Sequence, residues 1–261
     1  MPISFPTTFW SGFSPISLSP VLWLSGRYPE TAFQDAALTI PAASDGDRVG
    51  GRKDKSTALR HVTQSVESKR ATLKTGVNGQ NLKPGDLYDG FDDFLVYTTS
   101  GLGLGSGNFT IYTVFKNVTN ANIRVILSDY NSTTSLAGEI WHSVGDSLAN
   151  VLLYVRRTSA GSNNMRAATC TTVLANNTPY IATCVWDGDF SVRINGAAEA
   201  SVNTNSVSSI TGPRGIFVGA INNGNLPFNS NIYEIVVFPA AHSGSQIAQM
   251  ESYLNTEWAV Y

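Results

Sequence analysis

Short apolar runs rich in β-branched and aromatic residues, separated by turn residues, fill most of the chain. Residues 20–24 form the first such run, and residues 25–60 are rich in turns. Strand-length runs then follow at intervals typical of a sandwich: 61–64, 71–74, 94–98, 109–115, 123–127, 151–155, 165–172, 180–186, 190–194, 215–218 and 232–238. Asp187-Gly188 and Asn195-Gly196 indicate tight hairpin turns. The pattern predicts an all-β fold.

The clearest helical pattern comes at the end of the chain. Pro239 ends the last strand run, and Ser243 and Gln246 have the spacing of a capping box, in which each side chain bonds to the backbone N–H of the other. Behind this cap, apolar residues recur at steps of three and four: Ile247, Met250, Leu254 and Trp258. The sequence therefore predicts one short amphipathic helix at the C-terminus.

Residues 1–19 contain prolines, serines and the aromatic residues Phe5, Phe9, Trp10 and Phe13. We expect them to form an extended assembly arm that lies either on its own domain or on a neighbouring subunit. Full burial of one such ring contributes roughly 1.5–3 kcal/mol, so several rings could hold a subunit in place. The chain shows no internal repeat and no long linker. We therefore predict an arm of residues 1–19 and one β-sandwich domain of residues 20–261.

Composition limits the classes of function. Apolar residues make up 42% of the chain and charged residues only 14%, so a large core is combined with a surface of Ser, Thr, Asn and Gly. The net charge is −2 and the 17 basic residues are scattered, which argues against nucleic acid as a partner. No apolar run reaches the roughly 18 residues of a membrane span. The first residues lack the features of a signal peptide.

Three stretches stand out together in order and spacing. They are Leu-Trp-Leu-Ser-Gly-Arg at 22–27, the segment 46–95 with Tyr-Asp-Gly-Phe-Asp-Asp-Phe-Leu at 88–95, and the closing strand and helix at 232–258. Together they resemble the concanavalin A-like lectin/glucanase superfamily, in its laminin G-like branch of bacterial and phage proteins. The chain departs from that pattern at 24–26, where Leu-Asp-Ala is usual, and at 52–57, where Trp-x-Asp-x-Ser-Gly is frequent. The resemblance implies a two-sheet antiparallel jelly-roll sandwich that in most cases binds a partner.

A sugar site needs an aromatic ring to stack on the sugar, with amides and carboxylates for its hydroxyl groups. The sequence offers such groups in an expected loop at 129–131, in the nearby Trp-His pair, and in a late polar loop. The candidate glycan ligands are Asp129, Tyr130, Asn131, Trp141, His142, Asn222, Asn223 and Asn225. Loops at the ends of a sandwich are where binding residues gather.

The sequence gives less support for catalysis, for a bound metal ion or for a disulfide. None of the seven glutamates has an acidic partner two or four residues away, as a strand-borne glycosidase pair would require, and Glu139 before Trp141 is the nearest lookalike. We therefore predict no catalytic residues. The resemblance makes calcium a candidate cofactor, with acidic pairs at 45–47, 89–93 and 187–189, but we assign no cofactor and no metal ligand. For Cys170 and Cys184 we favour two buried thiols over a disulfide.

These observations favour a non-catalytic structural or surface protein of a virion, of the decoration or tail-associated kind and of bacteriophage origin. Its expected partners are other virion proteins, copies of itself and cell-surface glycans, with no nucleic acid and no membrane insertion. Two alternatives stay open: a free carbohydrate-binding module, and a polysaccharide hydrolase. Assembly would be expected to need the arm, whereas a free module would bind sugar as a monomer.

Overall fold

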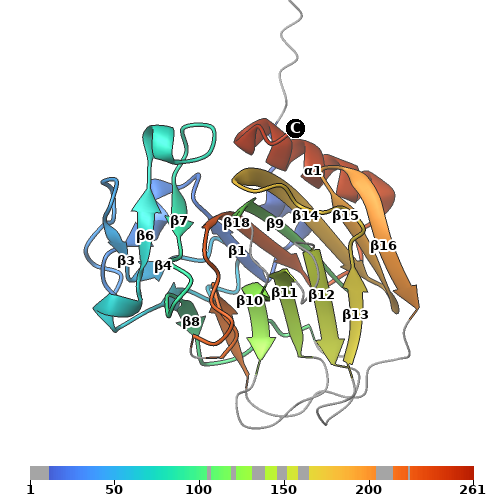
Figure 1. Cartoon of the computed structure of the whole chain (residues 1–261), viewed down its shortest axis with the longest axis horizontal. Helices are drawn as coiled ribbons and strands as arrows, with labels where there is room; N and C mark the ends of the chain where they lie inside the picture. Colours follow the sequence, from blue (N-terminus) through green and yellow to red (C-terminus); the bar gives the residue numbers. More distant parts are fainter. Residues whose placement is uncertain are drawn as a thin grey trace, which may run out of the picture.

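The structure is a computed structural model that describes residues 12–104, 107–118, 122–130, 139–145, 152–157, 165–203, 214–222 and 224–261. Two large antiparallel sheets face one another, and one α-helix packs outside them (Figure 1). Short 3-10 turns occur at η1 (Pro15–Leu18), η2 (Pro29–Thr31), η3 (Glu67–Lys69) and η4 (Gly76–Asn78). The predicted all-β, two-sheet jelly-roll sandwich with a C-terminal helix is confirmed, whereas residues 1–11 of the expected arm lie outside the described residues.

Sheet A contains the long central strands. Its order is β16 (Ala197–Asn203), β15 (Asp189–Ile194), β14 (Thr178–Trp186), β9 (Phe109–Asn117), β18 (Asn231–Phe238), β7 (Gly85–Leu87), β6 (Ala71–Lys74) and β3 (Arg48–Val49), with β1 (Leu22–Ser25) also paired to β18. The turns predicted at 187–188 and 195–196 join β14 to β15 and β15 to β16, as expected. All eight residues of β18 are buried, so this strand contributes to the packing on both faces of sheet A.

Sheet B forms the second layer. Its order is β13 (Met165–Thr169), β12 (Leu152–Arg157), β11 (Ile140–Val144), β10 (Arg124–Tyr130), β17 (Gly215–Val218), β8 (Leu95–Tyr97), β5 (Val62–Thr63), β4 (Gly51–Arg52) and β2 (Ala32–Phe33). The core between the two sheets is built from inward-facing residues such as Phe115, Trp186 and Ile216. Cys170 and Cys184 are both buried and form no disulfide. Cys184 lies on β14 of sheet A, and Cys170 directly follows β13 of sheet B.

The helix α1 (Gly244–Trp258) covers the outer face of sheet A. Its capping box is present, with Gln246 N–H donating to Ser243 Oγ. Met250, Leu254 and Trp258 of the predicted stripe are buried against outward-facing sheet A residues such as Tyr112, whereas Ile247 is only half-buried. In Figure 1, β9, β14 and β15 lie between α1 and the strands β10 to β13. None of the helices among the described residues is long and apolar enough to cross a membrane.

Candidate functional site

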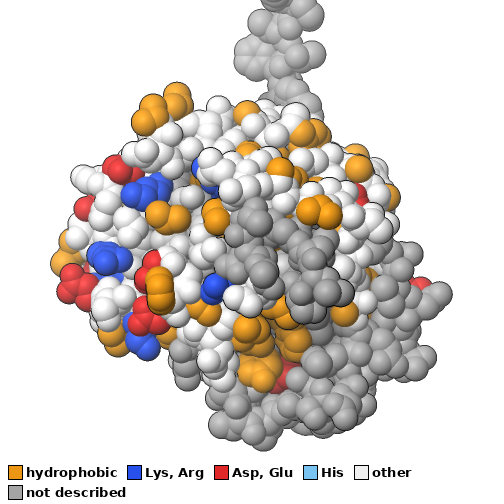
Figure 2. All heavy atoms as spheres, in the orientation of Figure 1, with side chains coloured by type: hydrophobic (Ala, Val, Ile, Leu, Met, Phe, Trp, Pro, Cys, Tyr) orange, Lys and Arg blue, Asp and Glu red, His pale blue; other side chains and the backbone are white. Residues whose placement is uncertain are grey.

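The two aromatic residues predicted to stack on a sugar lie together on the outer face of sheet B. Tyr130 is the last residue of β10, and Trp141 lies on the neighbouring strand β11. Their ring centroids are 6.2 Å apart with an interplanar angle of 77°, and both side chains are half-buried. Figure 2 shows a group of hydrophobic side chains over the region of β10 and β11. The pair therefore offers an aromatic surface to a ligand.

Strand register explains this grouping. Ser128 pairs with Trp141 on one side and with Phe217 on the other, and Phe217 in turn pairs with Val96. Residues paired across neighbouring strands point to the same face, so these four form a row across β8, β17, β10 and β11. Phe94 extends the row, with its ring centroid 6.2 Å from that of Phe217. Sequence reasoning missed Phe94 and Phe217, because they reach this row through the pairing of β17 with β10 and of β8 with β17, which joins segments far apart in sequence.

This outer face differs from that of sheet A in its covering. The outer face of sheet A is closed by α1, and Tyr112 and Phe238 there are fully buried. On sheet B, the described residues include no helix that packs over Trp141 or Tyr130. We call the row formed by the half-buried Tyr130 and Trp141 and by the buried Ser128, Phe217 and Phe94 the sheet B platform.

Asp129 does not belong to the surface of the platform. The expected loop at 129–130 is wrong, because both residues end β10, and alternation turns Asp129 inward when Tyr130 points outward. Asp129 is 1% exposed, its Oδ2 accepts from the Leu102 N–H at 3.0 Å, and its Oδ1 lies 3.9 Å from Arg214 Nε. Burial raises the pKa of Asp129, while the positive charge of Arg214 acts in the opposite direction. We therefore correct its predicted role: Asp129 is an interior carboxylate, not a sugar ligand.

His142 is also an interior residue. It follows the outward-facing Trp141 and so points between the sheets, where it is fully buried. Its ring stacks on Tyr154 with centroids 4.2 Å apart. Burial lowers the pKa of His142 to about 3, so the ring is neutral at physiological pH. The prediction that His142 contacts a sugar is wrong for this reason.

The predicted polar loop lies beyond the Phe94 end of the platform. Asn222 has a left-handed φ of 44° and is half-buried, and Asn225 is exposed and donates through Nδ2 to the Asn222 carbonyl at 3.2 Å. A Cβ atom at Gly224 would lie 3.6 Å from the Phe94 ring, so the loop borders the platform. Asn131 and Asn223 lie outside the described residues. Asn222 and Asn225 mainly turn the chain, and Asn225 keeps a side chain at the surface.

Three carboxylates gather in the loop between β7 and β8. Among the described residues, Asp89, Asp92 and Asp93 form a group in which one oxygen from each lies within 4.8 Å of the others. Burial raises the pKa of Asp93 to about 7, and the charge of Asp89 acts in the same direction. Oxygen-rich groups of this kind are the ligands that calcium prefers. Of the acidic groups that the sequence offers for calcium, this is the one whose three carboxylates lie together among the described residues.

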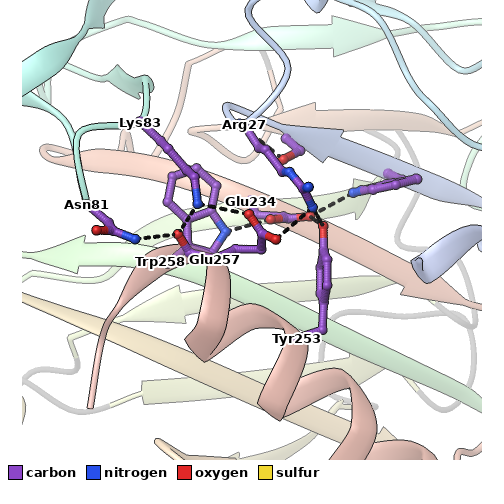
Figure 3. A network of polar contacts seen from close by, with 9 residues as sticks. Arg27, Asn81, Lys83, Glu234, Tyr253, Glu257 and Trp258 are labelled. Atoms are coloured by element: carbon purple, nitrogen blue, oxygen red, sulfur yellow. Dashed lines mark hydrogen bonds and ion pairs between the residues drawn. The ribbon is translucent and has the colours of Figure 1, made fainter. Parts of the chain in front are cut away.

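A separate polar network ties α1 to sheet A. Glu234 on β18 accepts from the indole N–H groups of Trp23 at 2.7 Å and Trp258 at 2.6 Å. Near it, Glu257 forms ion pairs with Arg27 and Lys83, each at 2.8 Å (Figure 3). These contacts join residues that lie far apart in sequence, and their partners are protein groups. The network therefore has a structural role.

A hollow of about 210 Å³ opens beside this network. Its lining residues are Gly12, Phe13, Arg27, Tyr253, Thr256 and Glu257. Phe13, the one predicted arm aromatic among the described residues, packs its ring 5.8 Å from that of Tyr253 in the same chain. Phe5, Phe9 and Trp10 lie outside the described residues. For Phe13, then, the arm lies on its own domain.

The hydrolase alternative depends on carboxylates that can reach a polysaccharide. Glu139, the glutamate that most resembles a glycosidase carboxylate in the sequence, is fully buried. Asp129 pairs with the next residue, Ile140, and is 1% exposed. Charge repulsion from Glu139 contributes to the raised pKa of Asp129, so the two are close enough to interact. A glycosidase pair must flank the scissile bond on the surface of a cleft, and these two buried groups do not do so.

Comparisons with known proteins support the fold. No protein-family model and no curated protein matches the chain. Similar solved structures include the binding domain of botulinum neurotoxin serotype G (15% identity, TM-score 0.55, 91% of this chain and 51% of that one) and the binding domain of botulinum neurotoxin DC in complex with SialylT (14%, 0.57, 92% and 52%). A third is botulinum neurotoxin type C, whose cell entry is described as dependent on interaction with two ganglioside molecules (13%, 0.55, 92% and 52%).

The chain spans about half the length of these neurotoxin structures. At such low sequence identity the likeness is one of fold, and it agrees with the two-sheet antiparallel sandwich described above. Architectures of this kind host many unrelated activities, so function must be argued from the residues of this chain.

Proposed function

We propose that this chain is a non-catalytic glycan-binding domain whose ligand lies against Tyr130 and Trp141 on the sheet B platform. The observation that supports this most directly is the pair of half-buried aromatic rings, 6.2 Å apart, on the sheet face that α1 leaves uncovered. Sugar rings have one apolar face, and a partly exposed indole is a suitable surface for it. The neurotoxin domains of similar fold, described with SialylT and with gangliosides, support the same class of ligand.

The low charge of the chain agrees with this proposal. Only 14% of its residues are charged, so a hydroxyl-rich ligand meets few competing charged side chains on the surface. The exposed Asn225 at the Phe94 end of the platform offers an amide for sugar hydroxyl groups. Contacts of this kind orient a ligand, while the aromatic pair contributes most of the buried area.

A glycan array tests the proposal. The labelled parent chain should bind at least one glycan, and the double variant Tyr130→Ala/Trp141→Ala should lose most of that signal. Tyr261→Ala is the matched control, because it removes another aromatic ring, 55% exposed, at the C-terminus near α1. If the parent chain binds no glycan, or if the double variant binds as well as the parent, the proposal is rejected.

For the biological setting, we retain the proposal of a bacteriophage virion protein, of the decoration or tail-associated kind. It is supported by the aromatic residues of the N-terminal segment and by the low surface charge. In this setting the chain would contact other virion proteins and copies of itself. Deletion of residues 1–19 should abolish assembly while leaving a folded monomer, as measured by light scattering. Normal assembly of the truncated chain would remove the arm from the account.

A further inference from the structure

We propose that the hollow of about 210 Å³ beside α1 binds a sugar that carries a carboxylate, and that Arg27 holds this carboxylate. The hollow lies on the side of sheet A that α1 covers, whereas the sheet B platform lies on the outer face of the other sheet. It is therefore a second site, and it does not depend on the sugar contact proposed for Tyr130 and Trp141.

Two segments that lie far apart in sequence build the hollow. Tyr253, Thr256 and Glu257 follow one another on α1 at steps of three and four, which places them on one face of the helix. Arg27 comes just after β1, and Figure 3 shows it pointing toward Tyr253 and Glu257. Its Nη1 donates to Tyr253 Oη at 3.5 Å and pairs with Glu257 Oε1 at 2.8 Å. Because these contacts hold the guanidinium in place before a ligand arrives, binding has little side-chain ordering cost to overcome.

Arg27 keeps donors for a ligand. Both of its side-chain contacts to Tyr253 and Glu257 use Nη1. Among the described residues, no hydrogen bond or ion pair involves Arg27 Nε or Nη2. The side chain is 35% exposed, so a ligand can reach it from solvent. Nε and Nη2 form one edge of the planar guanidinium, and such an edge binds both oxygens of a carboxylate.

The charges beside the hollow favour an anion. Arg27 and Lys83 each pair at 2.8 Å with the same carboxylate, that of Glu257. Glu234, the other carboxylate of the network, is 1% exposed and does not line the hollow. Two cations that share one carboxylate leave a surplus of positive charge. A negatively charged ligand therefore suits this position better than a cation.

The end of α1 near the hollow is covered by hydrogen-bond donors. The last carbonyl groups of a helix carry a partial negative charge, which by itself disfavours an anion. Here the Glu257 carbonyl accepts from Asn81 Nδ2 and the Trp258 carbonyl accepts from Gln80 Nε2, each at 2.9 Å. These donors reduce the negative potential at the helix end, so it opposes an anion less than an open helix end would.

The walls of the hollow suit a ring with hydroxyl groups. Phe13 and Tyr253 lie edge to face with centroids 5.8 Å apart, and aromatic side chains pack against the apolar face of a sugar. No described hydrogen bond involves the Thr256 hydroxyl, and each carboxylate oxygen of Glu257 has a second lone pair for a hydroxyl donor. A sugar acid uses the aromatic wall, these polar groups and Arg27 together, whereas a plain aromatic acid leaves the polar groups unused.

The volume limits the ligand to a small one. Pockets that hold drug-sized ligands measure about 300–1,000 Å³, and the hollow, at about 210 Å³, is smaller. We therefore expect it to take a single sugar-acid unit and not an extended oligosaccharide.

Ligand-detected NMR titrations of the full chain at one ionic strength test the site. The probes are glucuronate as the sugar acid, glucose as the neutral sugar and benzoate as the aromatic acid. We expect saturable binding of glucuronate, with glucose at least tenfold weaker because it lacks the carboxylate, and benzoate weaker because it lacks the hydroxyl groups. Equal or tighter binding of glucose would remove the carboxylate contact from the account. Equal or tighter binding of benzoate would overturn the assignment of a sugar.

Two variants locate the binding. Arg27→Lys keeps the positive charge but loses the planar edge, so it should weaken glucuronate binding at least tenfold. Thr256→Trp should abolish binding, because it places a large side chain at the hollow. Thr256 is exposed and no described hydrogen bond involves its side chain, so this variant should fold even if Arg27→Lys does not. Arg48→Lys is the matched control: it makes the same change at an exposed residue of β3 and should bind as the parent does.

Absence of saturable glucuronate binding by the parent would overturn the proposal, and so would unchanged binding by either folded variant. The double variant Tyr130→Ala/Trp141→Ala separates this site from the platform. It should keep the parent Kd for glucuronate, even though it should lose the glycan-array signal. A loss of glucuronate binding in that double variant would assign the sugar acid to the platform and would overturn the assignment to the hollow.

Discussion

Trp258 donates its indole N–H to Glu234 at 2.6 Å, and this bond fixes the end of α1 to sheet A. The other carboxylate oxygen of Glu234 accepts from the Trp23 indole on β1 at 2.7 Å. One buried carboxylate thus joins α1, which covers the outer face of sheet A, to β1 and β18 of that sheet (Figure 3). Neither indole could be satisfied by water at this depth, because Trp258 and Trp23 are 0% and 3% exposed.

The raised pKa of Glu234 should make the stability of the chain depend on pH. Burial raises its pKa to about 7 from an ordinary value of 4.5, although the two indole N–H groups act in the opposite direction. The folded chain therefore binds more protons than the unfolded chain between pH 4.5 and 7, and this residue's contribution to stability falls as the pH rises through that window. Subtracting the unfolding free energy of Glu234→Gln from that of the parent isolates this contribution.

We expect that difference to fall by on the order of 3 kcal/mol between pH 4.5 and 7, because one pKa unit corresponds to about 1.4 kcal/mol. Urea denaturation at several pH values measures it. Glu30→Gln is the control, because it makes the same chemical change at a side chain that is 66% exposed and so lacks the burial that produces the effect at Glu234. If the difference in unfolding free energy between the parent and Glu234→Gln did not change between pH 4.5 and 7, burial would not disfavour the ionised form of Glu234.

The buried ion pair between Arg52 and Asp86 gives a second prediction. Arg52 Nε donates to Asp86 Oδ2 at 2.8 Å, and the two residues are 3% and 4% exposed. Asp86→Asn should destabilise the chain by about 3–5 kcal/mol, because it leaves the guanidinium buried without its counter-charge. The double variant Arg52→Met/Asp86→Leu should lose less, since no charge remains.

Denaturant unfolding at neutral pH provides the comparison. Glu30→Ala serves as the control, because the ion pair of the exposed Glu30 with Lys55 is a surface contact at 3.9 Å, and such pairs contribute no more than about 1 kcal/mol. If Asp86→Asn cost no more than Glu30→Ala, the Arg52–Asp86 pair would not be desolvated as described.

The two cysteines should react only slowly with thiol reagents while the chain is folded. Cys170 and Cys184 are 3% and 0% exposed, and no disulfide joins them. A thiol reagent should react slowly with the native protein and rapidly with two groups per chain after unfolding in guanidinium, without added reductant. An unfolded chain that still fails to react would indicate a disulfide instead.

Local patterns were enough to predict much of the fold. The capping box at Ser243 and the two hairpin turns depend on residues a few positions apart, and all three are present. The strand β11 was not predicted, because Trp141 and His142 were interpreted as ligands near a loop. The strand β16 was also missed, since its Ala, Ser and Asn residues give little strand signal, and pairing with β15 supplies the hydrogen bonds.

The candidate site shows where sequence patterns stop being informative. Tyr130 and Trp141 were both selected, and the pairing of β10 with β11 brings them together. Their neighbours Asp129 and His142 were selected for the same chemical reasons, yet strand alternation turns both inward. The partner of Asp129, Arg214, is distant in sequence, so no local pattern could have predicted that burial.

The affinity of the strongest glycan from the array, measured by calorimetry for the parent chain and for Trp141→Ala, tests the central claim most directly. The account predicts that Kd rises at least tenfold in Trp141→Ala, a loss of about 1.4 kcal/mol, while Tyr261→Ala keeps the parent Kd. An unchanged Kd in a folded Trp141→Ala protein would contradict the assignment of the sheet B platform as the sugar-binding surface.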